Sequence, residues 1–159
     1  MPLFLKKALC FIATLGPIGF LPAPGTAGSL AALVAGWFIA TQGYLLLALA
    51  SLTALLIGII ASETYSQMSN TKDASEVIID EVAGQWVVLL CIPPLIEGAF
   101  LWYIVAFILF RFFDITKIGP VGMAEKLGGG IGIMADDIVA GGLAGSCLLA
   151  LQFAVYYSL

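Results

Sequence analysis

Long apolar stretches alternate with short polar segments along this chain. The apolar stretches cover residues 29–41, 44–61, 77–96, 98–113 and 138–157. A helix needs roughly 20 residues to cross the hydrocarbon core of a bilayer, so the second, third and fifth stretches fit and the other two are short. No stretch alternates as a membrane β-barrel strand does, and helices then remain to satisfy the backbone in lipid. We predict one all-α domain over residues 1–159, a polytopic helical membrane bundle with about five membrane helices.

Residues 8–21 form a shorter apolar segment that Gly16 and Pro17 interrupt. We expect this segment to lie along the membrane surface as an N-terminal interfacial helix, or to pack on the bundle.

Composition supports a bilayer environment. Apolar residues make up 62% of the chain and the mean hydropathy is +1.11, whereas soluble domains contain roughly 45–50% apolar residues. Ten acidic residues outnumber six cationic ones, for a formal charge of −4. This balance argues against nucleic acid as a partner, because bulk electrostatic attraction to phosphates is absent.

The positions of the cationic residues predict the orientation. With a cytoplasmic amino terminus, all of them fall on the inner side, as the positive-inside rule requires: Lys6, Lys7, Lys72, Arg111, Lys117 and Lys126. The outer side then holds only residues 42–43, residues 97–98 and the carboxyl terminus. A functional site is therefore expected at the cytoplasmic face.

Most acidic residues fall near the predicted inner ends of the helices, next to strongly apolar sequence. A carboxylate within a lipid-adjacent helix costs about 2.5–3.5 kcal/mol on the lenient insertion scale, so it usually pairs, takes up a proton or binds a cation. The candidates for a catalytic and metal-binding site are Asp80, Glu81, Asp114, Asp136 and Asp137.

Arg111, Asp114 and Lys117 follow one another at intervals of three residues, which places them on one helix face. A salt bridge beside a snorkelling lysine is one interpretation. The other is a site in which Asp114 binds a metal while Arg111 and Lys117 hold phosphate oxygens.

Residues 24–29 read Pro-Gly-Thr-Ala-Gly-Ser and form a turn that is expected to open the first membrane helix. Thr26 or Ser29 is available as its N-cap. Because a helix start presents unpaired amides to an anion, Gly25, Thr26, Gly28 and Ser29 are also candidates for substrate phosphate binding. A plain cap is the alternative.

The second glycine-rich segment, residues 128–132, is expected to form a loop before Asp136 and Asp137. Glycines allow unusual backbone angles and amides that can face an anion. Gly141 and Gly145 further along form a small-residue face, for which close helix packing is the preferred interpretation.

Several kinds of phosphoryl chemistry are excluded by what the sequence lacks. The chain has no histidine, which removes a Ser-His-Asp triad, a phosphohistidine and histidine-bound zinc. No cysteine is followed by arginine at the spacing of a cysteine phosphatase, and the P-loop motif is absent. The clustered carboxylates, as hard oxygen ligands, favour Mg²⁺.

Four blocks in order carry a family resemblance: residues 24–29, 79–86, 110–117 and 129–141. The sequence resembles the phosphatidylglycerophosphatase A family over most of its length. The resemblance implies a multi-pass enzyme of the bacterial inner membrane whose active site faces the cytoplasm. It also implies Mg²⁺-dependent hydrolysis of phosphatidylglycerophosphate to phosphatidylglycerol and phosphate. The five candidate carboxylates would then belong to the active site.

Two other functions compete with this one. A small cation or proton transporter would distribute its carboxylates through the depth of the membrane, whereas these are expected near one face. A phosphotransferase acting on another lipid phosphate is the closer alternative, although the D-G-x2-A-R run expected of an alcohol phosphotransferase is not found.

Overall fold

The computed structural model describes residues 1–71, 74–93 and 99–158, and the regular structure of these residues is entirely helical. In chain order the elements are α1 (Leu3–Ala13), η1 (Ile18–Phe20), α2 (Pro24–Gln42), α3 (Tyr44–Ser69), α4 (Ile79–Leu89), α5 (Ala99–Thr116), α6 (Pro120–Ala124), η2 (Glu125–Leu127) and α7 (Gly129–Ser158). The all-α class is therefore confirmed. Lys72 and residues 97–98 of the orientation argument and residues 94–96 of the third apolar stretch lie outside the described residues.

Within the described residues, 3 helices are long and apolar enough to cross a membrane: α2, α3 and α7. These helices indicate a membrane protein. The third apolar stretch behaves differently, since α4 has 11 residues and is only roughly 16 Å long, about half of the hydrocarbon core. The number of crossings stays a prediction.

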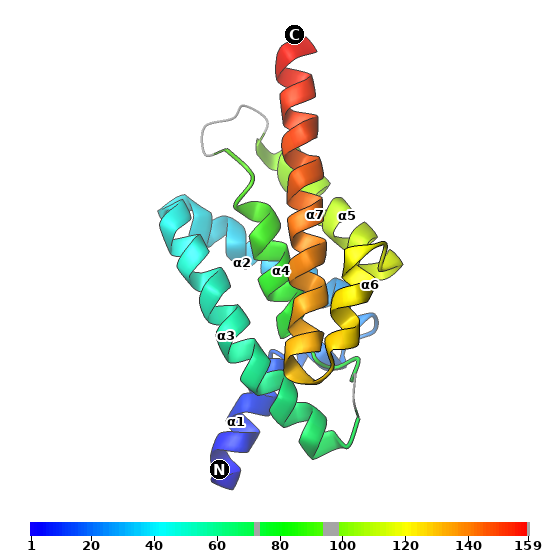
Figure 1. Cartoon of the computed structure of the whole chain (residues 1–159). Helices are drawn as coiled ribbons and strands as arrows, with labels where there is room; N and C mark the ends of the chain where they lie inside the picture. Colours follow the sequence, from blue (N-terminus) through cyan, green and yellow to red (C-terminus); the bar gives the residue numbers. More distant parts are fainter. Residues whose placement is uncertain (72–73, 94–98, 159) are drawn as a thin grey trace.

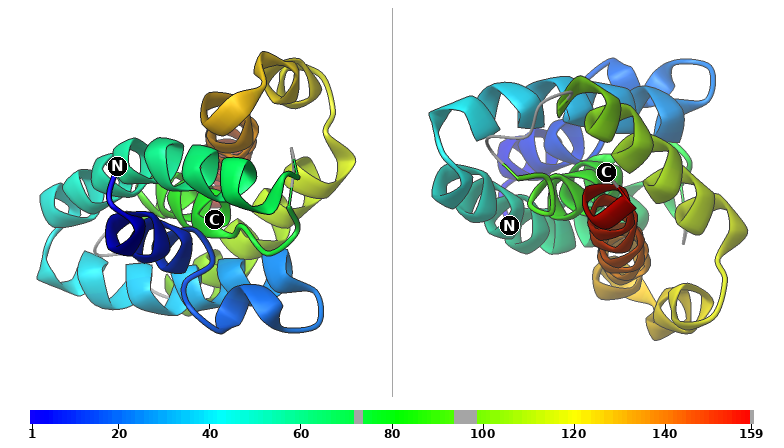
Figure 2. Two further views of the ribbon diagram at one scale, coloured as in Figure 1. Left: turned by 90° about the horizontal axis from the view of Figure 1, so that it is seen from below. Right: turned by 90° about the horizontal axis from the view of Figure 1, so that it is seen from above.

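The short helix α4 lies in the middle of the bundle, where it packs against α2, α3, α5 and α7 (Figures 1 and 2). Trp86 of α4 donates a hydrogen bond of 2.8 Å from Nε1 to the carbonyl oxygen of Ala32 in α2. On the opposite side, a Cβ atom at Gly141 of α7 would lie 2.5 Å from the carbonyl oxygen of Gly84. The backbones of α4 and α7 are therefore in close contact, as predicted from the small-residue face of Gly141 and Gly145.

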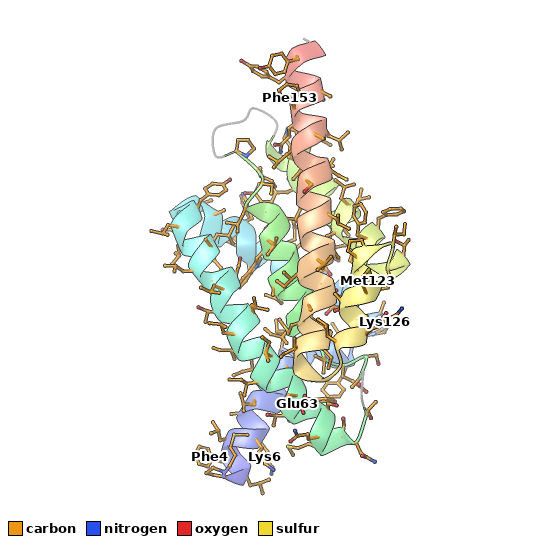
Figure 3. All side chains as sticks on the ribbon, in the orientation of Figure 1. Phe4, Lys6, Glu63, Met123, Lys126 and Phe153 are labelled. Atoms are coloured by element: carbon orange, nitrogen blue, oxygen red, sulfur yellow. The ribbon has the colours of Figure 1, made fainter. Side chains whose placement is uncertain are left out.

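The amino-terminal segment differs in detail from the expectation. Helix α1 begins at Leu3 and ends at Ala13, because the chain reverses through Leu15 and Gly16, whose φ angles are 47° and 63°. The helix packs against α3 and leaves Phe4 exposed. Figure 3 shows Phe4 and Lys6 at one end of the molecule and Phe153 of α7 toward the other. The reversal lies where Gly16 and Pro17 interrupt the apolar segment, and the contact with α3 agrees with the expected packing on the bundle.

Candidate functional site

Asp80 and Glu81 lie in the first turn of α4. The chain is fixed just before them, since the Ile78 amide donates to the carbonyl oxygen of Ala13 at 2.9 Å. Asp80 Oδ1 accepts the Glu81 amide at 3.0 Å. Unpaired amides and the positive end of the dipole favour anionic side chains at this position of a helix. The helix start thus holds two adjacent carboxylates in fixed positions inside the bundle.

The glycine-rich segment before Asp136 is mostly helix, which corrects the expectation of a loop. Gly128 and Gly129 have φ angles of 73° and 61°, and α7 begins at Gly129. The Gly130 amide donates to Glu63 Oε2 of α3 at 2.8 Å, so a side chain of the protein already takes the place expected for a bound anion. Asp136 and Asp137 consequently lie about two turns inside α7.

Asp80, Glu81 and Asp137 form the densest group of carboxylates among the described residues. One oxygen from each lies within 4.8 Å of the others, and Asp137 is only 2% exposed. Glu81 Oε2 and Asp137 Oδ2 are buried and have no hydrogen-bond partner within the described part of the chain. Crowded buried carboxylates destabilise one another unless they take up protons or a cation. Their number, hardness and spacing fit a divalent ion such as Mg²⁺.

Two cations lie beside this group and form ion pairs with the other two predicted carboxylates, Asp114 and Asp136. Arg111 Nη1 is 2.6 Å from Asp114 Oδ2 and 3.7 Å from Glu81 Oε1. Lys117 Nζ is 3.4 Å from Asp114 Oδ1 and donates a hydrogen bond to Asp136 Oδ2. The spacing of Arg111, Asp114 and Lys117 therefore produces ion pairs at the end of α5, as in the first of the two interpretations.

Lys117 follows the last residue of α5 and is partly buried. Burial alone lowers the pKa of its ammonium, but the hydrogen bond to Asp136 and the nearby charges of Asp136, Asp114 and Asp137 outweigh it, so the net pKa lies above the ordinary value. Lys117 therefore stays cationic at every physiological pH.

The start of α2 completes the site and corrects the predicted cap. Pro24 is the first helical residue, and its N-cap position is Ala23, which has a φ angle of 53° and supplies no side-chain cap. Thr26 and Ser29 lie inside the helix. The Ser29 hydroxyl donates to the Gly25 carbonyl oxygen at 2.8 Å and accepts a hydrogen bond from Arg111 Nη1 at 3.3 Å.

Gly28 packs on Ile78: a Cβ atom added at Gly28 would lie 3.0 Å from the Cβ atom of Ile78. Gly28 is not among the residues that line the cleft. Gly25 and Thr26 do line it. Because the first amides of a helix have no partner within the helix, these two residues can present theirs to an anion.

A cleft of about 780 Å³ joins these groups. All five predicted carboxylates line it, together with Arg111, Lys117 and the start of α2. Ser66, Glu63 and Glu125 also line the cleft and had not been singled out from the sequence. Glu63 lies just after the predicted stretch 44–61, and the sequence placed it with the other acids at the inner side without selecting it for the site.

Gln85 was also missed. It is fully buried one turn after Glu81, and neither of its side-chain polar atoms has a hydrogen-bond partner among the described residues. Burying a glutamine without hydrogen-bond partners lowers the stability of the folded state, so this position is suited to a test by substitution.

Comparison with known proteins supplies the family. A sequence profile of phosphatidylglycerophosphatase A matches residues 11–152. The phosphatidylglycerophosphatase A of Haemophilus influenzae is 35% identical over 134 residues, covering 83% of this chain and 80% of that protein. The Escherichia coli phosphatidylglycerophosphatase A is 30% identical over 142 residues, covering 89% of this chain and 78% of its own.

A third relative, from Bacteroides thetaiotaomicron, is provisionally named a phosphatidylinositol-3-phosphatase. It is 40% identical over 130 residues, covering 77% of this chain and 80% of the relative. No solved structure matches the chain. The profile and the two like-named relatives agree with the four sequence blocks, and the chain therefore belongs to the phosphatidylglycerophosphatase A family and is a phosphatase.

Proposed function

We propose that this protein is a Mg²⁺-dependent enzyme that hydrolyses phosphatidylglycerophosphate to phosphatidylglycerol and phosphate. The observation that carries the proposal is the pairing of a buried carboxylate group with two cations in one cleft. The names of the Haemophilus influenzae and Escherichia coli relatives support the choice of substrate.

Asp80, Glu81 and Asp137 are the residues proposed to hold Mg²⁺, because their oxygens lie close together and two are unpartnered among the described residues. When bound there, the ion would polarise the phosphoryl group and make bound water more acidic. Asp114 and Asp136 were also predicted as metal ligands. Since their oxygens contact Arg111 and Lys117, we assign them the positioning of these cations and leave direct ligation to the test below.

The cationic side of the cleft is proposed to bind the terminal phosphate. Arg111 can use its planar guanidinium on phosphate oxygens, and Ser29 orients that group from α2. The Gly25 and Thr26 amides add donors from the same side. Lys117 supplies a second positive charge where negative charge develops during hydrolysis. These donors are fixed by helices, so little reorganisation is needed in the reaction.

The level of the site along the bundle fits a lipid headgroup. From Asp137 to the end of α7 the helix is roughly 32 Å long, and from the start of α3 to Glu63 it is roughly 29 Å. Both lengths match a hydrocarbon core of about 30 Å. The carboxylates would then lie at one boundary of the bilayer. By the positive-inside rule this boundary is the cytoplasmic face of the bacterial inner membrane.

Acids gathered at one level favour a phosphatase over a cation or proton transporter, which needs carboxylates through the membrane depth. The Bacteroides thetaiotaomicron relative raises another lipid phosphate as the alternative substrate. A cleft of about 780 Å³ is large enough that volume alone does not select the headgroup.

The test is phosphate release by the purified protein in lipid vesicles, with Mg²⁺ or with a chelator. The substrates are phosphatidylglycerophosphate, phosphatidic acid and phosphatidylinositol 3-phosphate. We expect fastest release from phosphatidylglycerophosphate and none with the chelator. Preference for another lipid would overturn the substrate, and near-wild-type turnover in both Asp80→Asn and Asp137→Asn would overturn the metal site.

A further inference from the structure

A second hollow lies between α2 and α5, away from the polar cleft. Its volume is about 370 Å³, and its walls are Leu33, Val34, Trp37, Phe100 and Tyr103. The three residues from α2 share one helix face, since they are spaced by one and three positions, and the two from α5 are three apart. We call this hollow the α2–α5 groove. Its lining is almost wholly apolar, unlike that of the cleft.

The same two helices carry the phosphate-binding groups of the cleft. Arg111 of α5 donates to Ser29 of α2 at 3.3 Å, near the end of α5 and the start of α2. Because the groove brings later residues of α2 beside the start of α5, the two helices run in opposite directions. Along α2 the groove extends from roughly 6 Å to roughly 12 Å beyond Ser29. Along α5 it lies roughly 12–16 Å from the backbone of Arg111.

This spacing matches the layered structure of a lipid. The headgroup layer on each side of a bilayer is roughly 5–8 Å thick, the difference between the full bilayer and its hydrocarbon core. A lipid whose terminal phosphate lies in the cleft at the Arg111 guanidinium, which Ser29 holds at its own level along α2, would have its glycerol esters near the start of the groove. Its hydrocarbon would then lie along Val34 and Trp37.

We propose that the α2–α5 groove binds a fatty-acyl chain of the lipid phosphate whose headgroup occupies the cleft. The inference rests on the proposed function, which places a lipid phosphate in the cleft. In a bilayer the favourable free energy of binding does not come from removing the acyl chain from water, because the acyl chain already lies in hydrocarbon. It comes from close packing and from holding the lipid in one orientation relative to Arg111.

Filling the groove tests the proposal. Val34 and Leu52, an outward-facing residue of α3, are 54% and 51% exposed, so Val34→Trp and Leu52→Trp add bulk to similar apolar surfaces. Each variant is assayed with long-chain phosphatidylglycerophosphate and with its deacylated headgroup, which has the same terminal phosphate. Val34→Trp should lower kcat/KM about tenfold for the long-chain lipid and leave the deacylated compound unchanged. Leu52→Trp should change neither.

The smaller Val34→Leu change keeps the test usable if Val34→Trp does not fold, and it should cause a smaller loss in the same direction. Equal losses on both substrates, or no loss on either, would overturn the groove as an acyl site. Altered oligomeric state in Val34→Trp with normal kinetics would also overturn it, in favour of a contact between copies of the chain. If the wild-type protein released phosphate from neither substrate, the proposed function itself would fall, and the groove assignment with it.

Discussion

Arg111 Nη1 lies 2.6 Å from Asp114 Oδ2, one turn further along α5. The other oxygen of Asp114 is 3.4 Å from Lys117 Nζ. One carboxylate therefore separates and aligns the two cations of the cleft. This arrangement supports our proposal that Asp114 positions the cations, which agrees with the salt-bridge interpretation of the sequence and not with the metal-ligand one.

Replacing Asp114 by Asn separates these two roles. We expect kcat/KM for the lipid phosphate to fall about a hundredfold, because Arg111 and Lys117 lose their common partner and move from their places. The Mg²⁺ concentration that gives half-maximal activity should change little. A titration of activity against Mg²⁺ makes the measurement, and a large rise in the Mg²⁺ requirement would identify Asp114 as a direct ligand after all.

Binding of Mg²⁺ should stabilise the fold through Glu81. At a Mg²⁺ concentration of a hundred times Kd, the folded state gains about 2.7 kcal/mol, which a thermal unfolding experiment detects as a higher Tm. We expect the Glu81→Gln protein to lose this gain. Glu76→Gln is the matched control, since Glu76 precedes α4 and does not line the cleft. Equal Mg²⁺ responses in the two variants would place the ion elsewhere.

The close contact between α4 and α7 predicts opposite effects at two neighbouring glycines. A Cβ atom at Gly141 would press on the Gly84 backbone, whereas one at Gly142 would meet nothing within 4 Å. Gly141→Ala should cost about 1–3 kcal/mol of stability through overpacking. It should also lower activity, because α4 and α7 bring Glu81 and Asp137 together. Gly142→Ala should be neutral or stabilising by up to about 1 kcal/mol, since alanine favours the helix.

Unfolding of both variants in denaturant, with phosphate release measured in parallel, checks this prediction. A destabilised Gly142→Ala protein, or a fully active and stable Gly141→Ala protein, would show that the helices are spaced differently from the structure described here.

Gln85 offers a test of buried polarity. Leucine has a similar volume and no polar atoms, so Gln85→Leu should leave stability unchanged or raise it by about 1–3 kcal/mol. Gln67→Leu is the comparison, because Gln67 Nε2 donates a hydrogen bond of 2.7 Å to Glu63 and its loss should not stabilise the protein. Guanidinium unfolding monitored by tryptophan fluorescence gives both values. Marked destabilisation by Gln85→Leu would mean that the amide has a bonding partner in solution.

The sequence predicted the helical class and the acids that line the cleft, because carboxylates next to apolar helices are costly and therefore informative. The ion pairs of Arg111, Asp114 and Lys117 were one of the two interpretations of their spacing, since helix periodicity brings residues three apart close together. Such features depend on neighbours a few residues apart, which a sequence shows directly.

Features that depend on distant contacts were not predicted. The glycines after Gly128 were expected to form a loop because glycine permits unusual backbone angles. In the structure Gly130 instead packs tightly on α3, with its amide bonded to Glu63 far back in the chain. The N-cap of α2 was predicted at Thr26 or Ser29 because Thr and Ser favour that position, whereas Ser29 lies inside the helix and contacts Arg111 of α5.

The level of Asp137 along α7 has a kinetic consequence for the proposed reaction. A site at the boundary of the hydrocarbon core can receive its substrate sideways from the leaflet, without extraction of the lipid into water. Encounters would then follow two-dimensional diffusion, and turnover would vary with the surface density of the lipid phosphate instead of its bulk concentration. Diluting the substrate with inert lipid at constant total substrate should slow the enzyme.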